Sequence, residues 1–203
     1  ALKPDLVIGF SDIQADLARK LIAANMAVLI FNQRSIQEIL DVVVAIGNLV
    51  GRQQAAAELV AGYMAELERV ANETAQRAHR PRVYFEEWDE PTICGIAWIS
   101  ELIEIAGGRD VFADRATGKL AKDRFVTGTE VIETDPEVVL ASWCGKPFER
   151  SAFEGRQGFS DISAVRTGRV HEIAAEIILQ PGPASLTDGL ATLAQLIGGE
   201  SKS

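Results

Sequence analysis

One uninterrupted helical pattern, from Arg52 to His79, constrains this chain more than any other feature. The stretch has no proline, and its only interior glycine is Gly62. Apolar residues recur in it at the spacing of one helix face: Ala56, Leu59, Val60, Tyr63, Met64, Leu67, Val70 and Ala71. Such a helix is about 40 Å long, more than the width of a small domain. Strand-like and helix-like segments alternate on both sides of it. We therefore predict two α/β lobes that one helix connects, with a ligand-binding cleft between them.

Size and composition fit this arrangement. The chain has 203 residues, 47% of them hydrophobic, which is enough to form a folded core. The net charge is −9 and no cluster of Lys and Arg stands out, so we expect no nucleic-acid partner. An acidic surface suits a basic partner protein. No apolar run is long enough to span a bilayer.

The sequence begins abruptly. No signal peptide is recognisable, and residues 1–5 lead directly into an expected strand. We therefore expect the N-terminal lobe, residues 1–51, to be partial, with the connecting helix at 52–80 and the C-terminal lobe at 81–203. Any membrane attachment would come through an upstream lipid anchor or a permease.

Each lobe is predicted to contain a mainly parallel sheet with flanking helices, because strands and helices alternate. The first lobe has expected strands at 6–10 and 28–31 and helices at 13–23 and 36–50. The second has expected strands at 83–85, 138–141 and 170–173 and helices at 98–105, 129–133 and 185–197. Ser35 and Glu38 form a capping-box pattern at the start of a helix. Residues 86–92 and 142–158 are predicted to be loops.

Three phrases, in this order, resemble a known family. Residues 2–8 are LKPDLVI, residues 105–112 are IAGGRDVF, and residues 135–140 are DPEVVL. They are similar to recurrent phrases of the class III periplasmic or lipid-anchored substrate-binding proteins of ABC importers, in which one long helix joins two α/β lobes. The resemblance implies an extracytoplasmic protein that catalyses no reaction and carries a ligand to an ABC permease. Members of that family carry a further strand and cleft loop before the first phrase.

Three loops are expected to meet at the cleft, because ligands in open α/β sheets bind beyond the carboxyl ends of strands. These loops are residues 9–11, 86–98 and 142–146. All three tryptophans fall in or beside the last two loops: Trp88, Trp98 and Trp143. We predict that Trp88 and Trp143 lie at the cleft, where an indole can stack on an extended ring. Trp98 begins a helix and is predicted to pack in the core.

Other site residues follow from a resemblance to the cobalamin-binding subgroup. The phrases that carry it are FEEW at 85–88 and ASWCGK at 141–146. The resemblance implies that Phe10, Cys144, Gly145 and Glu176 contact the ligand, with Glu176 accepting from a corrin amide. The expected ligand is cobalamin or cobinamide, and no resident cofactor or metal is expected. For Glu176 the alternative is a solvated carboxylate, and for Cys144 it is a buried thiol.

The resemblance also implies one permease-docking carboxylate on each lobe. The matching positions are Asp16, on the first helix, and Glu130, at the start of a short helix. Glu130 has a simpler interpretation, because a carboxylate in the first turn of a helix interacts well with the helix dipole. The two cysteines, Cys94 and Cys144, are interpreted as buried thiols, and a disulfide between them is the alternative in an exported protein.

Several alternatives to a corrinoid stay open. Ferric siderophore pockets usually need Arg or Tyr, and haem pockets often use His or Tyr, but Tyr63, Tyr84 and both histidines lie outside the expected cleft loops. An enzyme could use Glu86 and Glu87, yet neighbouring strand residues point to opposite faces. No nucleophile elbow, P-loop, dinucleotide fingerprint or H-E-x-x-H motif occurs. A cytosolic sensor would need a DNA-binding motif, and none accompanies the lobes.

Overall fold

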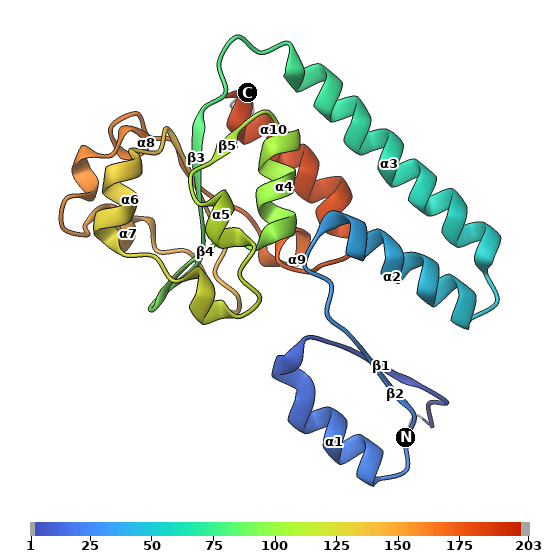
Figure 1. The fold of residues 1–203 in the computed structure, drawn as a ribbon. Coiled ribbons are helices and arrows are strands. Elements are labelled where there is room, and N and C mark those ends of the chain that lie inside the picture. The colour runs from blue at the N-terminus through green and yellow to red at the C-terminus, as the bar shows by residue number, and fades with distance from the viewer. Residues whose placement is uncertain (1–2, 200–203) are drawn as a thin grey trace.

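The computed structural model describes residues 3–199, and Figure 1 shows two α/β lobes of unequal size. The smaller lobe contains β1 (Val7–Phe10), a 3-10 turn, α1 (Ala15–Ala23) and β2 (Val28–Phe31). The two strands pair in parallel over their whole length, with Val7 opposite Val28. The first lobe therefore has the predicted strand, helix and strand, although α1 buries none of its side chains.

Two antiparallel helices, α2 (Ile36–Leu49) and α3 (Gln53–Ala75), connect the lobes (Figure 1). The predicted capping box starts α2: Ser35 Oγ accepts from the Glu38 amide, and the Glu38 carboxylate accepts from the Ser35 amide, both at 3.2 Å. Gly51 follows the end of α2 in the turn to α3 and has a φ of +68°, a conformation that glycine adopts without strain. The two helices cross closely, because a Cβ added at Gly47 would lie 2.3 Å from the Ala56 Cβ.

The connecting helix is shorter than the predicted range 52–80. It ends at Ala75, and the following residues run without regular structure to Pro81. The proline explains part of this difference, because its ring disfavours helical backbone at the preceding residue. The connector therefore consists of a helical part and a short non-helical segment that enters the second lobe.

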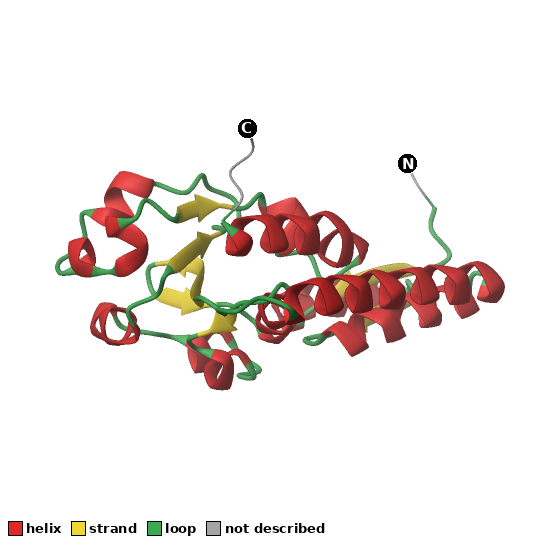
Figure 2. Cartoon of the chain, turned by 90° about the horizontal axis from the view of Figure 1, so that it is seen from above, coloured by secondary structure: helices red, strands yellow, loops and turns green. Residues whose placement is uncertain are grey.

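The second lobe has a five-stranded sheet, which Figure 2 shows among surrounding helices. Its strands are β3 (Arg82–Asp89), β4 (Thr92–Cys94), β5 (Arg109–Asp110), β6 (Val138–Ala141) and β7 (Val170–Glu172). The order is β4-β3-β6-β7, with β5 also pairing β3; β4 is antiparallel and the other pairings are parallel. The predicted loop at 86–92 is wrong, because β3 continues to Asp89 and turns into β4.

Helices and short turns cover both faces of this sheet. The helices are α4 (Ala97–Ile105), α5 (Ala113–Ala116), α6 (Gly128–Thr134), α7 (Arg150–Glu154), α8 (Ser163–Arg166), α9 (Ala175–Ile178) and α10 (Leu190–Gly198). Alternate residues of β3 serve opposite faces, as strand geometry requires. Val83 and Phe85 join a core with α3, α4 and α10, whereas Tyr84 belongs to a second core on the other face and packs edge-on against Phe112. The predicted loop at 142–158 is also partly wrong, since it contains α7.

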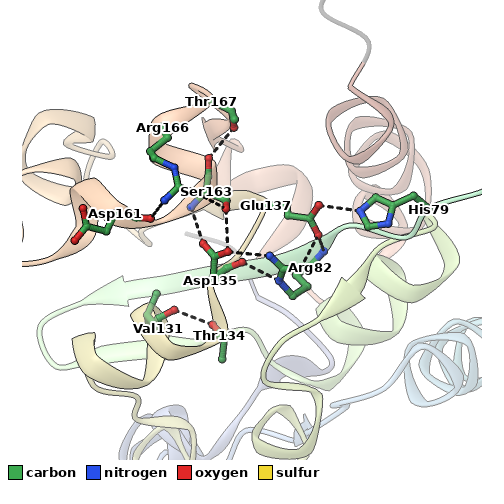
Figure 3. A network of polar contacts seen from close by, with 10 residues as sticks. All are labelled: His79, Arg82, Val131, Thr134, Asp135, Glu137, Asp161, Ser163, Arg166 and Thr167. Atoms are coloured by element: carbon green, nitrogen blue, oxygen red, sulfur yellow. Dashed lines mark hydrogen bonds and ion pairs between the residues drawn. The ribbon is translucent and has the colours of Figure 1, made fainter.

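A polar network holds the amino ends of β3 and β6 (Figure 3). Arg82 donates to the Asp135 carbonyl at 2.8 Å and to its carboxylate at 3.0 Å. Asp135 also accepts from the amide and hydroxyl of Ser163. Glu137 accepts from the Arg82 amide at 3.0 Å and lies 2.8 Å from His79. The network therefore ties His79, in the segment after α3, to the sheet. It lies at the amino ends of the strands, away from the edge where the carboxyl ends of β3 and β6 lie.

No helix in the described part of the chain combines the length and apolarity that crossing a membrane requires.

Candidate functional site

A cleft of about 460 Å³ lies between the lobes, at the carboxyl ends of β1 and β3. We call it the main cleft. Its lining residues are Phe10, Ser11, Ile13, Arg34, Glu87, Trp88, Ile93, Ile96, Trp98, Lys119, Leu120, Ala121, Arg124, Cys144, Leu179 and Gln180. The first three come from the smaller lobe, Arg34 from the connector between β2 and α2, and the others from the larger lobe. This position agrees with the rule that ligands bind beyond the carboxyl ends of strands.

Another hollow, of about 510 Å³, lies among β1, β2, α2, α3 and residues 181–183. Its side chains are almost all apolar, and only Gln33 and Arg52 bring polar groups. Ligand sites combine apolar walls with several convergent polar groups. The main cleft meets this description better, so we take it as the candidate site.

Aromatic side chains form much of the wall of the main cleft. Phe10 extends from the end of β1, and the half-buried Trp88 comes from the β3–β4 hairpin. The Trp88 indole donates to the Glu90 carbonyl at 3.0 Å, which fixes the ring against the hairpin. Trp98 is buried and donates to the Ile178 carbonyl at 3.1 Å, so its predicted core packing is confirmed. One side of Trp98 nevertheless reaches the cleft wall.

Trp143 differs from its prediction. Its side chain is only 4% exposed and does not line the main cleft. The indole donates to the Glu86 carboxylate at 3.1 Å and packs edge-on against Phe148. The polar and glycine-rich flanks suggested exposure, but Phe148, from later in the same loop, and Lys146 cover the ring.

The side chain of Lys146 lies between the rings of Trp88 and Trp143, and we call it the Lys146 ridge. Its ammonium lies 4.7 Å from the ring centroid of Trp88 and 4.7 Å from that of Trp143. Both carboxylate oxygens of Asp89 accept from it at 2.8 Å. Cation–π contacts and an ion pair thus hold the β3–β4 hairpin against the loop after β6.

Beyond this ridge lies a more polar hollow of about 460 Å³. Trp143, Gly145 and the exposed Glu176 line it, together with Lys146 and Glu172. The six predicted ligand-binding residues therefore divide between two hollows. Phe10, Trp88 and Cys144 line the main cleft, whereas Trp143, Gly145 and Glu176 line the polar hollow.

The two cysteines have different environments. Both are free thiols, so the alternative of a disulfide between them is wrong. Cys94 is buried as predicted, and burial raises the pKa of its thiol to about 12. The buried-thiol interpretation is wrong for Cys144, which is exposed and lines the main cleft. A ligand in the cleft can therefore reach the Cys144 sulfur.

Glu86 and Glu87 point to opposite faces of β3, as predicted. Glu86 is fully buried and accepts from both terminal nitrogens of Arg156, at 2.6 and 2.9 Å. It also accepts from the Tyr84 hydroxyl at 3.0 Å. Burial raises the pKa of the Glu86 carboxyl, although these donors act in the opposite direction. Glu87 faces the main cleft, so the two carboxylates cannot work as an acid–base pair.

Sequence reasoning missed the partner of Glu87. Arg124 forms a two-pronged ion pair with its carboxylate at 2.6 and 2.9 Å, and also donates to the Cys94 carbonyl at 2.6 Å. The Arg124 side chain is only 4% exposed. It comes from a 3-10 turn 37 positions away, and no local signal in the sequence predicts the pairing.

The two docking carboxylates lie in different surroundings. Asp16 is in the first turn of α1 with its side chain 93% exposed, and Arg19 lies 3.8 Å away. Glu130 caps α6: its carboxylate accepts from the Thr127 amide at 2.7 Å and hydroxyl at 2.8 Å, and it also contacts Arg115. The hydrogen bonds from Thr127 lower the pKa of Glu130. This capping role agrees with the simpler interpretation of Glu130 given above.

Two α/β lobes, connected by helices around a partly aromatic cleft, make up the architecture of this chain. A family model described as "Periplasmic binding protein" matches residues 1–177. The chain therefore belongs to the periplasmic binding protein family.

Two curated relatives are similar to the chain over most of its length. An uncharacterized ABC transporter substrate-binding lipoprotein of Bacillus subtilis, YvrC, is 25% identical over 97% of this chain and 63% of the relative. A cobalamin-binding protein of Halobacterium salinarum is 26% identical over 90% of this chain and 50% of the relative. The chain thus spans between half and two thirds of the length of these relatives.

Solved structures share the fold. The haem complex of IsdE from Staphylococcus aureus superposes with a TM-score of 0.78 at 18% identity, covering 96% of this chain and 77% of that one. The vitamin B12 binding protein BtuF of Vibrio cholerae gives a TM-score of 0.70 at 21% identity, covering 100% of this chain and 77% of that one. At these identities the likeness concerns the fold and leaves the ligand open.

Proposed function

We propose that this protein captures a corrinoid, cobalamin or cobinamide, in the main cleft outside the cytoplasm and delivers it to an ABC import permease. The observation that carries the proposal is the composition of the cleft wall. Phe10, Trp88 and Trp98 present aromatic surface, and isoleucines and leucines complete it. A corrinoid has a wide apolar face with a rim of amides, and such a wall can bury that face.

Two further facts support a corrinoid. None of the described residues that line the main cleft is a histidine or a tyrosine, the side chains that often bind haem iron. Arg34 and Arg124 do line it, so this fact bears on haem more than on a ferric siderophore. The cobalamin-binding relative from Halobacterium salinarum aligns with 90% of this chain. Gln180 and Arg34 lie in the cleft wall and could bind the amides of the rim. Glu176 could do so from the polar hollow if a substituent crosses the Lys146 ridge.

The permease is proposed to contact Asp16 on the smaller lobe and Glu130 on the larger lobe. Asp16 is the better placed of the two, because its carboxylate is almost fully exposed. Glu130 is already engaged by Thr127 and Arg115, so docking would have to compete with these contacts.

One observation favours haem as a second candidate ligand. Cys144 is exposed in the main cleft, and a cysteine thiolate is a known axial ligand of haem iron. Haem bound through Cys144 would show the absorbance bands of thiolate-ligated iron, and the Cys144→Ser variant would lose them.

Calorimetric titration with cyanocobalamin, cobinamide, haem and a ferric hydroxamate tests the proposal. We expect binding of at least one corrinoid, weakened about tenfold or more by Trp88→Ala and largely restored in Trp88→Phe, because the aromatic face is the attractive element. Near-ultraviolet circular dichroism would verify that the variants are folded. Heat with haem or the hydroxamate, but with neither corrinoid, would refute the corrinoid proposal.

A further inference from the structure

The main cleft has the opposite charge balance from the chain as a whole. The full sequence has 20 Lys and Arg against 29 Asp and Glu. In the wall of the cleft the cations are Arg34, Lys119 and Arg124, and the only carboxylate among the described lining residues is that of Glu87. Among the described lining residues, cations therefore outnumber carboxylates, which is the reverse of the balance in the whole sequence.

Two of the cations near the cleft are already neutralised. Arg124 is paired with Glu87 at 2.6 and 2.9 Å. Lys146, on the adjoining ridge, is paired with Asp89 at 2.8 Å. These pairs contribute polar surface but little net charge to a ligand.

Lys119 is different. It is exposed, it lies in the loop before the 3-10 turn Ala121–Arg124, and its side chain lines the cleft. No carboxylate of the described residues lies within ion-pair distance of its ammonium. Apolar side chains such as those of Leu120 and Ile96 line the same cleft. Arg34 lines the same cleft from the connector between β2 and α2, with its guanidinium 5.9 Å from the Phe10 ring.

We propose that the ligand of the main cleft carries an anionic group on its rim and that Lys119 binds this group. This inference rests on the proposed function and narrows its ligand class. A charge-assisted hydrogen bond to a phosphodiester or carboxylate is about twice as strong as a neutral one, so Lys119 would select between ligands of similar shape. Among corrinoids, cobalamin has a phosphodiester in its nucleotide loop and cobinamide lacks it, whereas haem has two carboxylates.

Calorimetric titration of the wild type, Lys119→Gln and Lys119→Glu with cyanocobalamin and with cobinamide tests the inference. Lys122→Gln is the matched control, because Lys122 is an exposed lysine three positions away that does not line the cleft. We expect Lys119→Gln to weaken cobalamin binding about three- to tenfold, Lys119→Glu to weaken it further, and high salt to reduce these differences. Cobinamide binding and the control variant are expected to stay within about twofold of the wild type.

The outcomes separate this inference from the proposed function. If the wild type binds cobalamin and Lys119→Glu does not weaken it, the inference is overturned while the function stands. Equal weakening of both corrinoids by Lys119→Gln also overturns it, since cobinamide has no phosphodiester. If neither corrinoid binds and haem does, the proposed ligand is wrong. A loss of haem affinity in Lys119→Gln, but not in Lys122→Gln, would then assign the anionic group to the carboxylates of haem. Binding of none of these ligands would overturn both proposals.

Discussion

Removing Arg156, the ion-pair partner of the buried Glu86, provides the sharpest test of the packing described above. Glu86 is fully buried, and two of its four hydrogen bonds come from Arg156. The guanidinium of Arg156 also lies 4.9 Å from the Phe153 ring and 5.4 Å from the Phe159 ring. Arg156→Met keeps most of the apolar stem but leaves a buried carboxylate with only the neutral donors Tyr84 and Trp143.

The expected loss is large for a single substitution. Deleting one member of a buried ion pair typically costs about 3 to 5 kcal/mol, because the remaining charge is stranded away from water. The Arg156 side chain is 25% exposed, so water can reach its end, and we expect the lower value, about 3 kcal/mol. Arg150→Met is the matched control. Its partner Glu154 is one helical turn away on the surface, and such pairs contribute about 0.3 to 0.5 kcal/mol.

The free energy of unfolding would be measured by urea denaturation at neutral pH, with tryptophan fluorescence as the probe. The double variant Arg156→Met, Glu86→Gln should recover part of the loss, because it removes the stranded charge. The pKa of Glu86 is raised in the folded state, and removing Arg156 raises it further. The deficit of Arg156→Met should therefore be smallest at acidic pH and grow as pH rises through the folded-state pKa. A loss below about 1 kcal/mol, or no dependence on pH, would refute this reasoning.

Three other predictions follow from local features. The hydrogen bonds from Ser163 lower the pKa of Asp135. The stabilisation that this carboxylate provides is present above its unfolded-state pKa and is lost as pH falls, so Asp135→Asn should lower the melting temperature at neutral pH and flatten its decline in acid. Gly47→Val should lower the free energy of unfolding, measured by urea denaturation, by about 1 to 3 kcal/mol, because the added side chain forces α2 away from α3. Gly62→Ala is the control: its Cβ would meet nothing within 4 Å, so it should raise the free energy of unfolding by up to about 1 kcal/mol. Equal effects of the two substitutions would contradict the close helix crossing. Iodoacetamide should label Cys144 but not Cys94 in the native protein, as peptide mass spectrometry would show, and a ligand in the cleft should slow the labelling.

Local patterns in the sequence determined much of this protein's architecture. The α2 capping box is a contact three residues apart, and Gly51 ends α2 through its own φ. The long apolar period predicted α3, and short apolar runs predicted β2 and β6 at the bounds observed. The opposite orientation of Glu86 and Glu87 also followed from strand geometry alone.

Only the tertiary structure decided the composition of the site. The partner of Glu86 is 70 positions away, that of Glu87 is 37 away, and that of Asp89 is 57 away. No helical or strand period relates such residues, so their pairing depends on how separate elements pack. The same packing buries Trp143, exposes Cys144 and brings Lys119 to the cleft. Backbone periodicity is a local property, whereas the burial and charge of a binding site arise from segments that meet only in the folded chain.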